Sequence, residues 1–380
     1  VSAAGVMGHL SAALIVLAMA ICSIRAFPIE KPDGPRLGMV MIALVALLSI
    51  GDALGPVVDT DAVYYHVALP KQIWLGGELL GGNLHPNGSR PMLFHAPYSM
   101  LFGWGGETAL PLFSWLTGLA LAGSVLQRAE AIQSRSGLWA LLLLFSSWTF
   151  LHELGVGANN LMTAFLVWTC WLAIRQDNIT TASVLAAAAL SVKYTAFGVV
   201  AALWLFLIQG NSKKVKAFLI VSGTVSVWWV WNLLNGLHPL FPYAGWALDL
   251  PFQHLEKYGM GRNWLNLLLL PYNAVMHAEI DTFRFLGQLH PLWLLGAPFA
   301  IGSLSKTPRL GWVVLLALVF WGIGPHWLRH LLPAMPLIAL FVALGLSFPL
   351  ASLGVFRGLA FFCMCSSSSR SSYEAGPPGP

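Results

Sequence analysis

Long apolar runs are the feature that most constrains the fold of this chain. A transmembrane helix rises 1.5 Å per residue and must cross about 30 Å of hydrocarbon. About eleven runs approach that length, and the shorter ones need polar flanks or locally thin lipid to cross. Only 9% of the 380 residues are charged and 57% are hydrophobic, which excludes a soluble multidomain protein. We therefore expect an all-α, polytopic membrane protein. The runs are residues 4–26, 37–54, 108–126, 138–151, 160–174, 181–192, 195–208, 217–234, 289–304, 310–323 and 331–351.

The distribution of basic residues predicts the orientation of these spans. With the N-terminus outside, thirteen of the twenty Lys and Arg residues fall in cytoplasmic loops, which is the direction the positive-inside rule requires. Ten of the fifteen acids then fall on the opposite face. The net charge of +5 therefore reflects topology, and nucleic acid is not an expected partner. We expect the chemistry at the non-cytoplasmic face, in two long loops at about 57–107 and 235–288.

The domain organisation follows from the same pattern. Residues 1–365 are expected to form one transmembrane domain, and the Ser- and Pro-rich residues 366–380 a disordered tail. The run 4–26 lacks a basic n-region, so it is interpreted as a true span and not as a signal peptide.

The segment after the second span carries two acids, Asp59 and Asp61, immediately outside an apolar helix. A carboxylate in such a place is partly desolvated, which raises its basicity. An enzyme that takes a sugar from a lipid phosphate needs one carboxylate to deprotonate the acceptor, because the phosphate leaves without a proton donor. The alternative is a solvated loop with two ordinary surface acids.

Residues 61–71 resemble the first outside loop of the GT-C superfamily, in the branch of dolichyl-phosphate-mannose protein mannosyltransferases and bacterial polyprenyl-phosphate-sugar transferases. Residues 191–195, 235–242, 258–273 and 328–336 resemble later family motifs in the same order. The resemblance covers about 51–346 and implies a GT-C-like fold of about eleven helices. It also implies an inverting glycosyltransferase of the bacterial inner membrane, which transfers a sugar from a polyprenyl-phosphate donor to a glycan, lipid or protein acceptor.

The resemblance also implies roles for individual residues. Asp61 matches the family's loop acid and is expected to be the catalytic base, with Asp59 as its helper. Lys193 and Arg329 match basic positions that hold the lipid-linked phosphate, although snorkelling or headgroup anchoring would also place a cation there. The remaining residues expected to contact substrate are Tyr65, His66, Lys71, His95, Arg262, His326 and His330.

Two departures from the family pattern bear on activity. His95 stands where relatives often have Glu, and Asn159 and Asn160 stand where they often have Asp. A lipid-linked-sugar transporter or flippase, and a non-catalytic subunit that binds a partner through its outside loops, therefore stay open as alternatives. No metal site is predicted, because no tight ligand spacing is present, but a divalent cation also stays open. Its candidate ligands are Asp59, Asp61, His66, His85 and His95.

Overall fold

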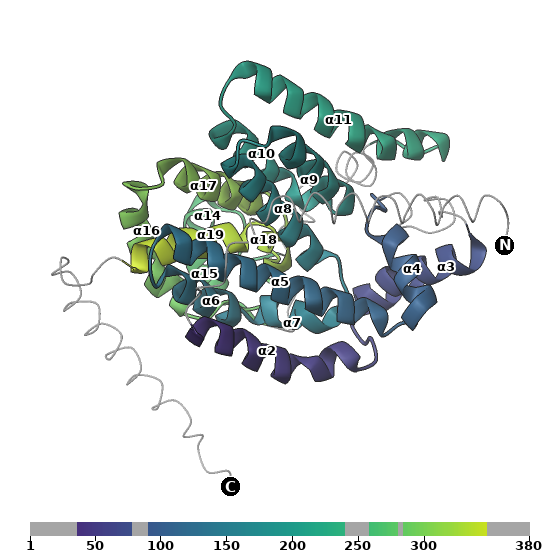
Figure 1. Ribbon diagram of the computed structural model, residues 1–380, viewed down its shortest axis with the longest axis horizontal. Coiled ribbons are helices and arrows are strands. Elements are labelled where there is room, and N and C mark those ends of the chain that lie inside the picture. The colour runs from purple at the N-terminus through teal and green to yellow at the C-terminus, as the bar shows by residue number, and fades with distance from the viewer. Residues whose placement is uncertain (1–35, 78–89, 240–257, 280–283, 348–380) are drawn as a thin grey trace, which may run out of the picture. The chain divides into compact units, whose positions relative to one another are not determined.

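The computed structural model describes residues 36–77, 90–239, 258–279 and 284–347, all of which belong to one compact unit that ends at Ser347. Within these ranges the chain forms helices and turns, without a β-strand. The expected all-α fold is thereby confirmed (Figure 1). The expected span 4–26, the expected tail 366–380 and His85 lie outside the described residues.

Helices occupy the other apolar runs, but few are long enough to cross a bilayer alone. By length and composition, three described helices qualify: α2 (Arg36–Leu54), α5 (Ala109–Ile132) and α11 (Asn211–Leu234). The run 138–151 is not one straight span, because α6 (Ser136–Ser146) and α7 (Trp148–Val156) meet at an angle of 71°, and as a pair they make a fourth candidate. The shorter apolar helices are α8 (Asn160–Arg175), α9 (Ile179–Val192), α10 (Phe197–Leu207, after the 3₁₀ turn Tyr194–Ala196), α16 (Leu292–Leu304), α17 (Pro308–Ile323) and α19 (Met335–Leu346).

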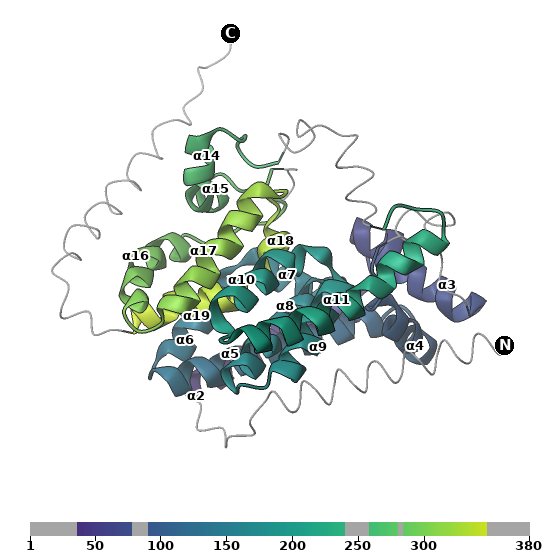
Figure 2. The same ribbon diagram turned by 90° about the horizontal axis from the view of Figure 1, so that it is seen from above.

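The two long segments expected as loops also contain helices. The first holds a π-helical stretch, η1 (Ala62–Val67), followed by α3 (Ala68–Gly76) and α4 (His95–Gly105). The second holds α14 (Trp264–Leu268) and α15 (Leu270–Met276), which lie beside each other in Figure 2. A further short helix, α18 (Leu328–Leu331), precedes α19. These short helices carry or flank most of the residues expected at the site.

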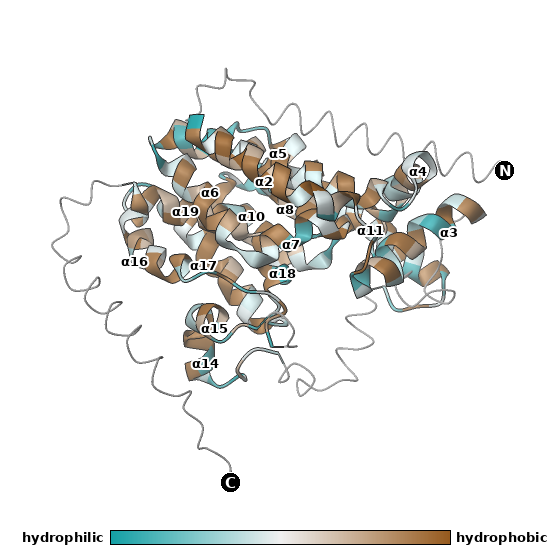
Figure 3. Cartoon of the chain, turned by 90° about the horizontal axis from the view of Figure 1, so that it is seen from below, coloured by the Kyte–Doolittle hydropathy of each residue, from teal (hydrophilic) through white to brown (hydrophobic). Residues whose placement is uncertain are grey.

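The core is built around α8 and α9, whose residues are almost all buried. The Ala-rich sequence of α9 has small side chains, which let α8 and α11 approach it closely. In contrast, α2 buries only Gly38 and Ala53 and exposes large apolar side chains such as Leu47 and Leu48. Hydrophobic residues predominate along the helices in Figure 3. Apolar surface of this kind on outer helices is suited to contact with lipid.

The crossing of α16 and α19 depends on a glycine. A Cβ atom on Gly345 would overlap the backbone carbonyl of Phe299, and the Ser303 hydroxyl donates to the Phe341 carbonyl (2.6 Å) at the same crossing. We expect Gly345→Ala to destabilise the protein by about 1–3 kcal/mol, because backbone atoms cannot move aside as a flexible side chain can. Thermal unfolding in detergent measures the effect.

Gly223 provides the matched control for this prediction. It lies inside α11 with open space where its Cβ would be. Gly223→Ala should therefore be neutral or stabilising by about 0.5–1 kcal/mol, the difference in helix propensity. Equal melting temperatures for the two variants would contradict the role assigned to Gly345.

Candidate active site

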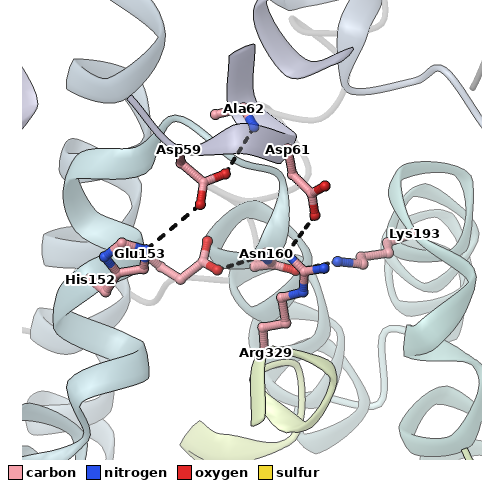
Figure 4. Close-up of polar contacts among 8 residues, drawn as sticks. All are labelled: Asp59, Asp61, Ala62, His152, Glu153, Asn160, Lys193 and Arg329. Carbon is pink, nitrogen blue, oxygen red and sulfur yellow. Dashed lines mark hydrogen bonds and ion pairs between the residues drawn. The ribbon is translucent and has the colours of Figure 1, made fainter. Parts of the chain in front are cut away.

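Asp61 and Arg329 form an ion pair between two distant parts of the chain. Asp61 precedes η1 at the end of the segment that follows α2, and Arg329 lies on α18. Arg329 Nη1 is 2.6 Å from Asp61 Oδ2 (Figure 4), and its guanidinium also lies 4.4 Å from the centre of the Trp327 ring. The Arg329 side chain is 21% exposed, so the pair is partly shielded from solvent. The first and the last of the sequence motifs therefore meet at one place.

Asp59 lies beside this pair and organises the start of η1. Its Oδ1 accepts a hydrogen bond from the Ala62 amide (2.9 Å), and its Oδ2 is 3.9 Å from Nε2 of His152. His152 in turn stacks on Trp148, with ring centres 4.4 Å apart. The nearby His152 imidazole is the main cause that lowers the pKa of Asp59, with a further contribution from the Ala62 amide. Asp59 is therefore ionised at neutral pH, and it contacts Ala62 and His152 while Asp61 pairs with Arg329.

Lys193 ends α9 and reaches the same region through an amide. Its ammonium donates to Asn160 Oδ1, and Asn160 Nδ2 donates to Glu153 Oε1 (2.7 Å). Glu153 lies on α7 and is 4% exposed. In Figure 4 the three side chains form a row next to Asp61 and Arg329. The site therefore gathers three carboxylates and two cations from four segments of the chain.

Tyr65, His66 and His95 form an aromatic group next to η1. The His66 and His95 rings stack with an interplanar angle of 11° and centres 5.4 Å apart, and the Tyr65 and His66 centres are 3.9 Å apart. Arg90 lies over the Tyr65 ring at 5.5 Å. Burial lowers the pKa of His66 well below its usual value, so this imidazole is neutral at neutral pH. The structure thus brings three of the predicted substrate contacts together in a buried group.

Two other residues predicted to contact substrate, Lys71 and Arg262, bind groups other than Asp61 and Arg329. The Lys71 ammonium pairs with Glu107 (3.3 Å), and both side chains are about half exposed. Arg262 donates to the carbonyls of Ile323 (2.7 Å) and Gly324 (2.6 Å), which satisfies the C-terminal end of α17.

His326 and His330 lie close to Arg329 in sequence but differ in their surroundings. His326 is fully buried, and its Nε2 is 2.9 Å from the Gly322 carbonyl. His330 lies on α18 beside Arg329, with its ring 5.3 Å from that of Trp327. Burial, with the positive charges of Lys193 and Arg329, holds the pKa of His330 well below its usual value. His330 is therefore neutral at neutral pH.

The sequence motifs did not identify Glu153 as part of the site. A signal was present, because an acid within a largely apolar stretch is costly unless it has a partner. In the described part of the chain, no group of three or more His, Cys, Asp or Glu residues is arranged to hold a metal ion.

No protein-family model and no curated protein matches this sequence. A similar solved structure is the crystal structure of ArnT from Cupriavidus metallidurans bound to undecaprenyl phosphate, with a TM-score of 0.54 and 15% sequence identity. The similarity covers 88% of this chain and 63% of the ArnT chain, so this chain spans less than two thirds of the protein it resembles. The expected fold class is therefore confirmed: the chain is an all-helical, polytopic membrane protein with a fold similar to that of this ArnT.

Proposed function

We propose that the chain is a GT-C-type glycosyltransferase that takes a sugar from a polyprenyl-phosphate donor and transfers it, with inversion, to an acceptor. The ion pair between Asp61 and Arg329 carries the proposal, with Lys193 as a second cation nearby. A carboxylate for the acceptor and cations for the phosphate are the groups that this reaction needs. The fold shared with an ArnT that binds undecaprenyl phosphate supports the class of donor.

The transfer exchanges one bond for another at the anomeric carbon. The acceptor oxygen forms a bond to this carbon while the bond from the carbon to the phosphate oxygen breaks, and the electron pair leaves with the polyprenyl phosphate. Asp61 takes the proton of the acceptor hydroxyl. Arg329 and Lys193 stabilise the negative charge that grows on the phosphate.

Donor binding and base activation are coupled in this arrangement. Arg329 has Asp61 as its counter-ion in the present structure. A bound phosphate offers Arg329 a second anion with geometry suited to two parallel hydrogen bonds. Asp61 then shares its cation with the phosphate, which leaves its carboxylate oxygens available to the acceptor hydroxyl. The acceptor is deprotonated only beside a bound donor.

The same proposal places the reaction at the non-cytoplasmic face of a bacterial inner membrane. Asp61 follows the C-terminal end of α2, Lys193 follows that of α9, and Arg329 follows α17. The loops at the opposite ends of these and the neighbouring helices carry most of the basic residues, for example Arg175 and Lys213. The positive-inside rule assigns those loops to the cytoplasm.

The test is release of polyprenyl phosphate by the purified full chain in nanodiscs, with a polyprenyl-phosphate sugar as donor and candidate acceptors added in turn. We expect release together with a glycosylated product whose anomeric configuration is inverted. Flipping of the donor across liposomes without a covalent product would instead indicate a transporter. Absence of donor binding, together with stable co-purification of one partner protein, would indicate a non-catalytic subunit.

A further inference from the structure

Glu153 is a buried carboxylate in the candidate site to which the reaction proposed above gives no role. Its Oε1 accepts from Asn160 Nδ2 at 2.7 Å, and Asn160 Oδ1 accepts from the Lys193 ammonium. We propose that Glu153 is a positioning residue that acts through Asn160 to keep Lys193 charged and directed at the phosphate of the donor. This inference rests on the proposed function and adds a residue to it.

The local fold explains how Glu153 reaches the site. The 71° bend between α6 and α7 falls at Ser147, whose hydroxyl accepts from the Phe150 amide (3.3 Å) and so caps the start of α7. At the other end, Gly157 has a φ of 75°, which is the left-handed region that glycine adopts without strain. The chain therefore turns sharply between α7 and α8, and Glu153 near the end of one helix faces Asn160 at the start of the next.

The amide separates the two charges instead of letting them form a direct pair. An ammonium has three donors, and the hydrogen bond to Asn160 uses one of them. In the described part of the chain, Glu153 Oε2 is buried without a hydrogen-bond partner, so the contact of Glu153 with Asn160 is the one that connects it to Lys193. Glu153 thus attracts Lys193 across Asn160 and leaves ammonium donors for an anionic ligand.

The charges around Lys193 show why such support is needed. Partial burial and the positive charge of Arg329 lower the pKa of Lys193, whereas Glu153 and Asp61 act in the opposite direction. The other titratable or charged groups that face it are His330 on α18, His66 on η1 and Arg90 before α4. Phosphate binding needs the ammonium, which is present below the pKa and lost as the pH rises through it. Removal of the Glu153 charge should therefore move this loss to lower pH.

The first test reads the charge of Lys193 without any ligand. Glu153→Gln keeps an oxygen that can accept from Asn160 and removes only the charge. The rate at which an amine-reactive ester modifies Lys193 is measured by mass spectrometry from pH 6 to pH 9, on the full chain in nanodiscs. Only the neutral amine reacts. With the pKa of Lys193 at about 7, the loss of one pKa unit raises the neutral fraction about fivefold at pH 6, so we expect modification at pH 6 to be roughly fivefold faster in Glu153→Gln.

Asp177→Asn is the matched control, because Asp177 pairs with Lys213 at an exposed site on another loop. It should leave the rate at Lys193 unchanged. Equal rates at Lys193 in the wild type and in Glu153→Gln would overturn the inference, whether or not the protein binds a lipid.

The second test measures the binding of polyprenyl phosphate, with polyprenol as the uncharged reference. We expect Glu153→Gln to bind about twofold more weakly than wild type at pH 6 and roughly tenfold more weakly at pH 8. Lys193→Arg added to Glu153→Gln should remove this pH dependence, because guanidinium stays charged. Identical pH profiles in wild type and Glu153→Gln would overturn the role in phosphate binding. Failure of the wild type to prefer the phosphate over polyprenol would overturn the proposed function, while the modification rates would still decide whether Glu153 charges Lys193.

Discussion

Asp61→Asn is expected to reduce sugar transfer by a factor of about 10²–10⁴, the usual contribution of a general base. The amide is nearly the same size as the carboxylate and can still accept a hydrogen bond from Arg329, but it cannot take the acceptor proton. Binding of polyprenyl phosphate should be kept or strengthened, because one negative charge beside the phosphate is removed. Initial rates of polyprenyl phosphate release and the Kd for polyprenyl phosphate measure the two effects separately.

Asp52→Asn is the matched control for this variant. Asp52 is exposed near the end of α2, and its substitution should leave both the rate and the Kd unchanged. The unfolding temperature of Asp61→Asn should stay near that of the wild type, which separates a chemical effect from a folding effect. Transfer by Asp61→Asn at the wild-type rate would show that another group is the base.

Arg329→Gln is expected to weaken the binding of polyprenyl phosphate by more than about tenfold and to reduce transfer by about 10²–10³. The substitution removes the cation that pairs with Asp61 at 2.6 Å and that would stabilise the leaving phosphate. Arg329→Lys should recover only part of the activity, because an ammonium keeps the charge but not the paired hydrogen bonds or the stacking on Trp327.

Arg175→Gln, on the exposed end of α8, is the control, since its charge lies at the opposite end of the helices.

A double-mutant cycle that combines Arg329→Gln with Asp61→Asn provides a sharper test. If Asp61 and Arg329 act as one unit, the double variant should lose less activity than the product of the two single losses. Strict multiplication of the two losses would mean that the ion pair has no part in the reaction.

Most helices could be predicted from the sequence, because side-chain hydrophobicity acts over a local window. The run 160–174 became α8 (Asn160–Arg175), and the run 217–234 lies within α11 (Asn211–Leu234). The break at Ser147 could not be predicted in this way, because the segments on both sides of it are largely apolar. The segments treated as loops contain helices too short for their hydrophobic periodicity to be recognised.

The candidate site could be predicted in part. Family-like motifs singled out Asp61, Lys193 and Arg329, which the structure places close together. The resemblance also predicted that Arg262 contacts substrate. In the structure, Arg262 donates to the carbonyls at the end of α17. Glu153 was not predicted, because the family pattern has its acid at the positions of Asn159 and Asn160. In the structure, the carboxylate beside Asn160 comes from Glu153 on the preceding helix.

The sequence by itself determined that this is a helical membrane protein and where most of its longer helices lie. Both properties follow from transfer free energies and backbone hydrogen bonding within a single segment. Only the tertiary structure decided that Asp61 pairs with Arg329 and that Glu153 reaches Lys193 through Asn160. Such contacts depend on how far each helix end extends and on the angle at which helices cross, and these are set by packing between segments distant in the chain.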